Sequence, residues 1–201
     1  MLVGLETFTS DIDVVVYRSQ NCCRVHDSLK TLANDKKSRV KAYSLEELKG
    51  LFGFRSKDTP MTFEDFVRTE SRKVLQGKFE GYNYFVRCIV DWGEVNEQYG
   101  VVQYKSMGGA KIKARVTDDS EIVFTPCHYG IDKVEVVEGV KTKPIREIVS
   151  FRGRFCEQAR KGEFVVAQGK VEEVLRRDEP AFYRLLLGNN VTDFLVLAEK
   201  A

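Results

Sequence analysis

The stretch that decides the fold lies close to the start of the chain and reads Thr9-Ser10-Asp11-Ile12-Asp13-Val14-Val15-Val16-Tyr17. Its β-branched run is typical of a buried strand. Side chains two positions apart on a strand point the same way, so Asp11 and Asp13 are expected to face together from its start. Like charges this close repel unless a cation lies between them, and such a pair suits Mg²⁺ bound together with substrate phosphates. The pattern therefore predicts a metal site at the head of the strand.

The composition is that of an ordinary soluble globular protein. The chain has 201 residues, enough for one large domain or two small ones, and 43% of them are hydrophobic. Its 32 basic and 30 acidic residues give a net charge of +2, so any binding of nucleic acid would need a local basic patch. Five cysteines without a CxxC pair indicate neither a disulfide framework nor a zinc site. We see no membrane span and no signal peptide, and we expect a cytoplasmic protein that does not bind membranes.

Outward from the acidic strand, the first half of the chain alternates helices and strands. Helical spacing of apolar residues predicts helices over 21–34 and 62–76, and a capping box of Ser44 and Glu47 opens another that ends at Gly50 or Gly53. Further strands are expected over 39–43 and 82–90. The alternation of strand, helix and strand implies a crossover unit whose first two strands are parallel.

The pattern changes near residue 99, where short strands separated by turns begin. Strands are expected over 100–104, 110–116, 121–126, 133–137, 147–154, 163–171, 182–187 and 194–197. Strands at such short spacing favour a small barrel or sandwich. The predicted fold class is therefore α+β, with an α/β domain over 1–96 and a β-rich, barrel-like domain over 97–201.

Gly4, Ser10-Asp11-Ile12-Asp13 and the valine run resemble the motif of the nucleotidyltransferase superfamily of the DNA polymerase beta type, most closely its uncharacterised archaeal members. The family motif is a Gly-Ser followed, after a spacer, by Asp-x-Asp at the head of a strand. The resemblance implies a mixed sheet with flanking helices and Asp11 and Asp13 as ligands of Mg²⁺ or Mn²⁺. It also implies nucleotide phosphates near Gly4 and Ser10. The expected reaction moves a nucleoside monophosphate from an NTP to an unknown acceptor.

Two features depart from this family pattern. The Gly-Ser would fall just before Met1, so the chain is expected to start inside the motif and to lack the family's first strand. The family's third carboxylate lies on a neighbouring strand, and Lys41 occupies one such position, where its charge would repel a cation. Asp91, at the end of strand 82–90, is then the expected third ligand and base, with Glu94 as the alternative.

Two other functions remain open. The first half can be a degenerate, non-catalytic scaffold, with the second half binding RNA or a protein. Lys111, Lys113 and Arg115 alternate with apolar residues, which predicts a cationic strand face suited to RNA. The chain can also be a structural homo-oligomer that pairs through the sheet edge left open by the missing first strand.

Overall fold

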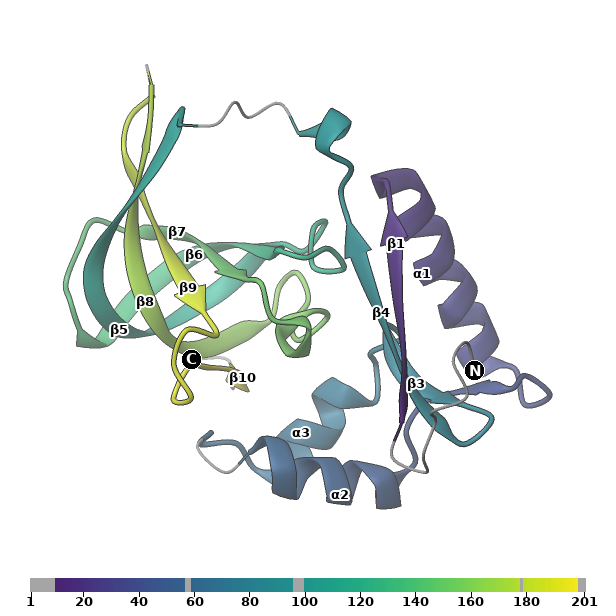
Figure 1. Ribbon diagram of the computed structural model, residues 1–201. Helices are drawn as coiled ribbons and strands as arrows, with labels where there is room; N and C mark the ends of the chain where they lie inside the picture. The colour runs from purple at the N-terminus through teal and green to yellow at the C-terminus, as the bar shows by residue number, and fades with distance from the viewer. Residues whose placement is uncertain (1–9, 57–58, 96–99, 178, 199–201) are drawn as a thin grey trace.

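The computed structural model describes residues 10–56, 59–95, 100–177 and 179–198. It contains a four-stranded sheet in the first half of the chain and a six-stranded sheet in the second (Figure 1). The predicted mixed α and β class with a β-rich second half is therefore confirmed at this level. Gly4 and the lead-in segment over 1–9 lie outside the described residues.

The first half forms a mixed sheet with helices around it. Its elements are β1 (Asp11–Tyr17), α1 (Ser19–Asn34), β2 (Val40–Lys41), α2 (Leu45–Arg55), α3 (Phe63–Glu70), β3 (Gln76–Phe79), β4 (Tyr82–Ile89) and the short 3₁₀ turn η1 (Trp92–Glu94). The strand order is β1-β4-β3-β2, and β1 runs parallel to β4 while the other neighbours are antiparallel. β1 and β2 therefore point the same way, as expected, but they lie on opposite edges of the sheet.

Two predicted helix bounds are wrong. Helix α2 begins at the predicted capping box, where the Glu47 N–H donates to the Ser44 hydroxyl over 3.3 Å, but it continues past Gly50 and Gly53 to Arg55. Both glycines have open space around them and adopt the helix without strain. The helix predicted over 62–76 is instead the short α3, and Gln76 already begins β3. The extra turn of α2 carries Phe54 and Arg55 to the site described below.

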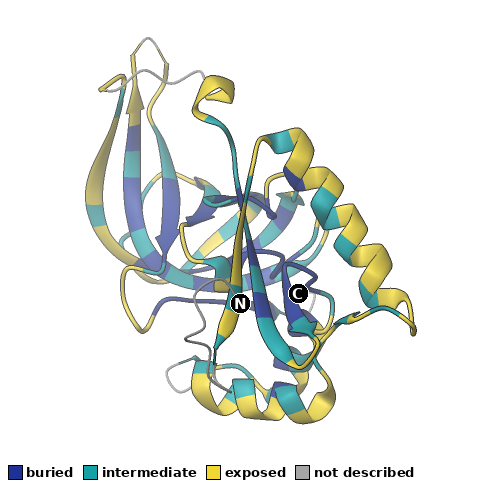
Figure 2. Cartoon of the chain, turned by 45° about the vertical axis from the view of Figure 1, so that its right-hand side comes forward, coloured by how far each residue is buried: buried dark blue, intermediate teal, exposed yellow. Residues whose placement is uncertain are grey.

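β1 is an edge strand, whereas the valine run predicts a buried one. Within the described residues it has a neighbour on one side only, and Val14 and Val15 are 41% and 45% exposed. Ile12 and Val16 pack against the core, so one face of the strand is covered (Figure 2). Pairing of the open edge with a second chain stays a prediction.

The second half is a closed barrel, which confirms the predicted barrel-like arrangement. It consists of β5 (Val102–Asp118), β6 (Cys127–Gly139), β7 (Ile145–Ser150), η2 (Gly153–Phe155), β8 (Phe164–Arg176), β9 (Phe182–Leu187) and β10 (Phe194–Ala198). The ring closes because β8 pairs with both β5 and β9. β10 pairs antiparallel with the first part of β8. The strand order β5-β6-β7-β9-β8, with β7 parallel to β9, is the connectivity of an OB-fold, although a fold alone does not show a function. The strand predicted over 121–126 is a turn region, and the first two predicted strands are one continuous β5.

The two halves share one core. Buried side chains of the first sheet, such as Tyr84 and Val86, join those of the barrel, such as Phe124 and Phe155, in a single cluster. Glu157 adds a polar link, since its buried carboxylate accepts the N–H groups of Val74 and Leu75 at 3.0 Å. The sheets fall on either side of residue 96, but that domain boundary stays a prediction. Among the described helices, none is long and apolar enough to cross a membrane.

Candidate functional site

Asp11 and Asp13 lie at the start of β1 and share one face of the sheet, as the strand period predicts. In the register with β4, Asp11 is opposite Asn83 and Asp13 is opposite Phe85. The Asn83 side-chain amide donates to Asp11 Oδ1 over 3.0 Å. Asn83 therefore orients the first carboxylate, and both Asp11 and Asp13 are exposed. Ser10 directly precedes this pair, outside the strand.

A pocket of about 220 Å³ opens beside Asp11. Its walls come from the end of α2 and from the β3–β4 region, and they include Tyr43, Leu51, Phe54, Arg55, Gln76, Asn83, Tyr84 and Phe85. Burial raises the pKa of the Tyr43 hydroxyl, so this phenol stays a neutral hydrogen-bond donor at physiological pH. The Asp11 carboxylate and the Arg55 guanidinium thus line one hollow, an arrangement that suits a metal-bound phosphate.

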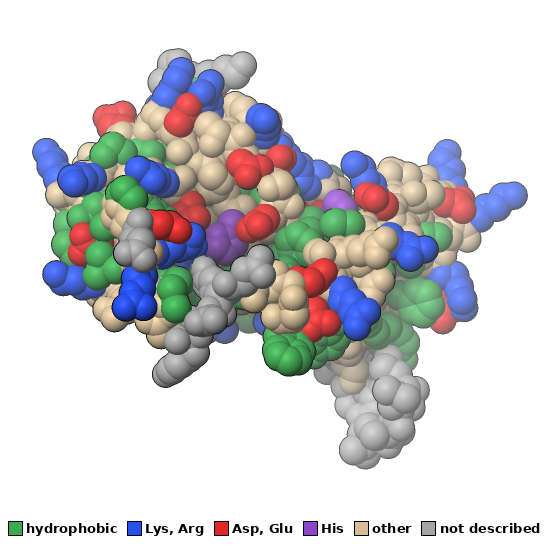
Figure 3. Space-filling view, turned by 90° about the horizontal axis from the view of Figure 1, so that it is seen from above, with side chains coloured by type: hydrophobic (Ala, Val, Ile, Leu, Met, Phe, Trp, Pro, Cys, Tyr) green, Lys and Arg blue, Asp and Glu red, His purple; other side chains and the backbone are tan. Residues whose placement is uncertain are grey.

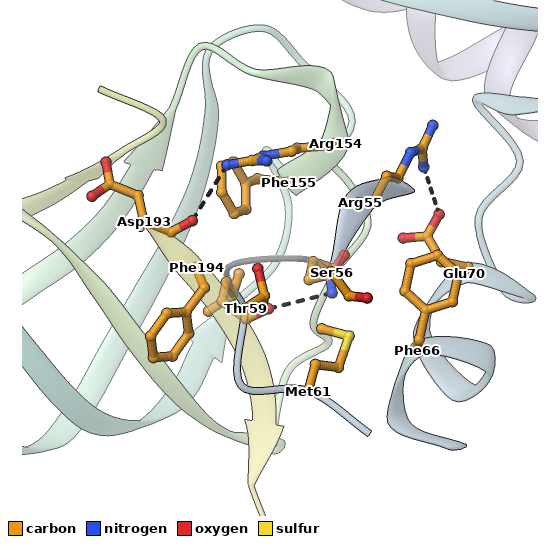
Figure 4. A pocket seen from close by; sticks show the side chains of 12 residues that line it. Arg55, Ser56, Thr59, Met61, Phe66, Glu70, Arg154, Phe155, Asp193 and Phe194 are labelled. Atoms are coloured by element: carbon orange, nitrogen blue, oxygen red, sulfur yellow. Dashed lines mark hydrogen bonds and ion pairs between the residues drawn. The ribbon is translucent and has the colours of Figure 1, made fainter. Parts of the chain in front are cut away.

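Arg55 is held from behind by a buried polar cluster. Its guanidinium donates to Glu70 Oε2 over 3.0 Å (Figure 4). It also donates to the Gln76 side-chain oxygen over 3.2 Å. The Lys73 ammonium bonds the other Glu70 oxygen at 2.5 Å and the Arg154 carbonyl at 2.8 Å. Two cations therefore share one carboxylate, and the cluster keeps a net positive charge beside the pocket.

Arg55 also lines a larger cleft between α2 and the barrel. This cleft, of about 480 Å³, is bounded by Phe54, Arg55, Thr59, Arg152, Arg154 and the loop Gly188-Asn189-Asn190-Val191. We call it the arginine cleft. Three guanidiniums reach it from two separate elements, and its described lining contains no acidic residue. Burial lowers the pKa of Arg154; Asp193 opposes this, and the cations Arg152 and Arg55 lower it further. An anion in the cleft would relieve that repulsion.

The loop on the far wall of the arginine cleft is held by a buried carboxylate. The backbone N–H groups of Gly188, Asn189 and Asn190 all donate to Asp193 Oδ2, over 2.9, 2.9 and 3.1 Å. Consecutive N–H groups of this kind form an anion-binding concavity, which the protein fills with its own side chain. The loop is consequently preformed, and it presents Val191, 75% exposed, at the rim of the cleft.

Asp91 does not join Asp11 and Asp13. Because β1 and β4 are parallel and Asp11 lies opposite Asn83, Asp91 falls beyond the other end of β4, about 25 Å along the strand. There it forms an ion pair of 3.2 Å with Arg18. Its neighbour Glu94 accepts from the N–H and hydroxyl of Ser19, which lower the pKa of the Glu94 carboxyl. Asp91 and Glu94, the two predicted third carboxylates, thus both contact residues at the start of α1.

Lys41 does not oppose a cation at Asp11, contrary to the prediction. β2 lies on the far edge of the sheet from β1, so the two side chains are separated by two strands. The Lys41 ammonium donates to the backbone carbonyls of Asp35 and Lys36 at the end of α1. It satisfies carbonyl groups at that helix end, a position that favours a cation.

The donor set at the start of β1 fits a hard divalent cation delivered with a nucleotide. Asp11 and Asp13 supply two carboxylates, and Mg²⁺ in proteins is commonly bound through one or two carboxylates together with waters and substrate phosphates. Across the described part of the chain, no group of three or more His, Cys, Asp or Glu side chains is placed to hold a metal. The substrate would therefore have to complete the coordination.

The cationic stripe on β5 is largely neutralised. Its alternation is as predicted, with Ile112 and Ala114 fully buried. However, Lys111 forms an ion pair of 3.3 Å with Glu138, and Arg115 makes two bonds to Asp132. On the face seen from above in Figure 3, acidic and basic side chains are likewise interspersed. RNA contact through Lys111, Lys113 and Arg115 stays a prediction, and the arginine cleft is the less compensated basic surface.

The convergence of Arg55, Arg152 and Arg154 was not predicted from the sequence. Arg55 ends α2, whereas Arg152 directly precedes η2 and Arg154 lies within it, and no local spacing connects the first with the other two. One local signal existed, since the aromatic Phe54 directly precedes Arg55, and in the structure Phe54 is 80% exposed. An exposed aromatic next to a cation is a reason to look for a binding surface.

No protein-family model matches this chain, and no solved structure matches it. It is similar to the uncharacterised protein MJ1086 of Methanocaldococcus jannaschii, with 32% identity over 188 residues. The match covers 94% of this chain and 53% of that protein. The chain thus spans about half the length of the curated relative that it matches.

Proposed function

We propose that the chain carries out metal-dependent nucleotidyl transfer from a nucleoside triphosphate to an acceptor hydroxyl. The observation that supports this most directly is the placement of Asp11 and Asp13 on one sheet face, beside a pocket that Arg55 also lines. Nucleotidyl transfer depends mainly on positioning and on compensation of phosphate charge. Carboxylates for a metal and a guanidinium for phosphates are the groups that such a reaction needs.

The residues of the pocket divide these tasks. A bound Mg²⁺ would be held by Asp11 and Asp13 and would supply charge stabilisation for the phosphates. Asn83 keeps Asp11 oriented through its amide. Arg55, held by Glu70, presents a rigid guanidinium to phosphate oxygens, and such planar donors bind phosphate in a two-pronged manner. Tyr84 forms part of the pocket wall, and it is held there by a hydrogen bond of 2.9 Å from its hydroxyl to the Val74 carbonyl.

The test measures metal binding and transfer in the same protein. Binding of Mn²⁺ in the presence of ATP is followed by electron paramagnetic resonance, and release of pyrophosphate is followed with each of the four ribonucleotides. We expect tight Mn²⁺ binding that requires the nucleotide and is lost in the variant Asp11→Asn/Asp13→Asn. The exposed acid Asp27 on α1 supplies the control, Asp27→Asn, which should bind as the wild type does. Equal Mn²⁺ binding by all three proteins would refute the proposal.

A second candidate is a non-catalytic module that binds nucleic acid on the same scaffold. It is favoured by the position of Asp91, because the described residues bring no third carboxylate to Asp11 and Asp13. This candidate predicts binding of an oligonucleotide without nucleotide-dependent Mn²⁺ binding and without pyrophosphate release. The two measurements above therefore separate it from the enzyme.

A further inference from the structure

The arginine cleft carries an excess of positive charge in the part of the protein that the structure describes. Arg152 makes its hydrogen bond of 3.4 Å to the Gly188 carbonyl, and Arg154 bonds the Asp193 carbonyl at 3.3 Å. Neither guanidinium forms an ion pair with a carboxylate among the described residues, although the charge of Asp193 acts on Arg154. Arg154 lies over the Phe155 ring, 4.7 Å from its centre, which holds it in place without neutralising it. The cleft thus offers two fixed cations beside Arg55.

Phe54 lines both the pocket beside Asp11 and the arginine cleft, so it lies where the two meet. Its ring is 80% exposed, whereas Phe52, Phe63 and Phe66 of the same region stack edge to face. Phe54 therefore presents an aromatic ring to solvent at the rim of both hollows. Exposed aromatic rings beside cations are the standard platform for bases of single-stranded nucleic acids.

We propose that the arginine cleft binds a single-stranded nucleic acid, with Arg152 and Arg154 on its phosphates and Phe54 stacked on a base. The strand end would then lie next to Asp11, so the bound strand would be the acceptor of the transfer proposed above. The acceptor role depends on that proposed function, whereas the binding itself does not. A single strand suits the site better than a duplex, because stacking on Phe54 requires an unpaired base.

The binding test uses the full chain without nucleotide or metal. Fluorescence anisotropy follows end-labelled oligouridylate and oligothymidylate of roughly a dozen nucleotides, titrated over a range of salt concentrations. We expect Arg152→Gln/Arg154→Gln to weaken binding about tenfold or more, and to reduce the salt slope by about 0.7 per arginine. Phe54→Ala should weaken binding about tenfold, whereas Phe54→Tyr keeps a stacking ring and should restore it. The two oligonucleotides distinguish RNA from DNA as the source.

Two matched variants locate the effect. Arg24→Gln/Lys30→Gln removes the same charge from the exposed face of α1, and it should leave both affinity and salt slope unchanged. Lys111→Gln/Lys113→Gln tests the β5 stripe, and a loss confined to this variant would overturn the proposal. Equal competition by polyglutamate and by unlabelled oligouridylate would also overturn it, since the cleft would then attract any polyanion.

The variant Asp11→Asn/Asp13→Asn separates this inference from the proposed function. It should bind the oligonucleotides at least as tightly as the wild type does, because neither carboxylate lines the arginine cleft and each would repel the phosphates of the strand end. If the wild type binds the oligonucleotides but shows no transfer activity, the proposed enzymatic function is refuted and the proposed binding site stands. If the wild type shows transfer activity but does not bind the oligonucleotides, the proposed binding site is refuted and the proposed enzymatic function stands.

Discussion

Asp11 and Asp91 lie at opposite ends of the parallel pair β1–β4, with Asp11 opposite Asn83 and Asp91 beyond Ile89. This relationship decides which acids can act together. Under the proposed function, a metal bound at the start of β1 would have Asp11 and Asp13 within reach, and its remaining ligands would come from water and substrate. Asp91 instead holds Arg18 at the junction of β1 and α1.

The first prediction is that Asp91→Asn leaves nucleotide-dependent Mn²⁺ binding unchanged. The substitution removes an ion pair in which Arg18 is 70% exposed, so the free energy of unfolding should fall by no more than about 1 kcal/mol. Urea denaturation measures the stability, and electron paramagnetic resonance measures the metal. A weakened metal site in this variant would place Asp91 near Asp11 in solution and contradict the register.

The second prediction concerns Glu157, which is 1% exposed and joins the two halves. Burial by itself raises the pKa of its carboxyl, but hydrogen bonds from His26 and from the N–H groups of Leu75 and Val74 bring the net value below the ordinary 4.5. A lowered folded pKa stabilises the fold above the unfolded pKa, and that stability is lost as the pH falls through the folded value.

Glu157→Gln should therefore lower the free energy of unfolding by about 1–3 kcal/mol at neutral pH. The difference from the wild type should shrink as the pH falls below 4.5. Urea denaturation at a series of pH values measures it, and Glu64→Gln, at an exposed acid in the first turn of α3, is the control. A difference independent of pH would show that the charge of Glu157 does not matter.

Local pattern predicted the parts of this structure that depend on neighbours in the chain. The shared direction of Asp11 and Asp13 follows from the strand period, and the start of α2 follows from the Ser44 and Glu47 capping box. The short strands separated by turns were sufficient to predict a barrel-like second half. The end of α2 was not predicted, because Gly50 or Gly53 was expected to end the helix, although an exposed helix tolerates a glycine at a cost of about 1 kcal/mol.

Long-range pairing was not predictable from the same patterns. Whether β1 neighbours β2 or β4 decides the roles of Lys41 and Asp91, and no residue near β1 encodes that choice. The arginine cleft likewise forms because η2 of the barrel packs near the end of α2. Arg55 and Arg154 become neighbours only after the shared core has formed.

The third prediction compares two glycines. An added Cβ at Gly50 would meet no atom within 4 Å, so Gly50→Ala should raise the free energy of unfolding by about 0.5–1 kcal/mol through helix propensity. At Gly169 in β8 the same methyl would lie 2.5 Å from the Leu186 carbonyl oxygen, so Gly169→Ala should be destabilising by about 1–3 kcal/mol. Thermal denaturation of both variants checks the opposite signs, and equal signs would contradict the described packing.

The last prediction concerns the cluster behind Arg55. Glu70 is 5% exposed and compensates both Arg55 and Lys73, and Lys73 is 3% exposed. Glu70→Gln leaves two cations without a carboxylate, so the free energy of unfolding should fall by about 3–5 kcal/mol. Lys73→Met should cost less, because Glu70 keeps Arg55 and the methionine fills the same space.

The double variant Glu70→Gln/Lys73→Met tests whether these residues act as a unit. Removing Lys73 takes away one of the two stranded cations, so the double variant should be less destabilised than the sum of the single variants, by about 1 kcal/mol or more. Urea denaturation of the four proteins completes the cycle. Simple additivity would mean that Lys73 and Glu70 do not compensate each other, contrary to their contact in the buried cluster behind Arg55.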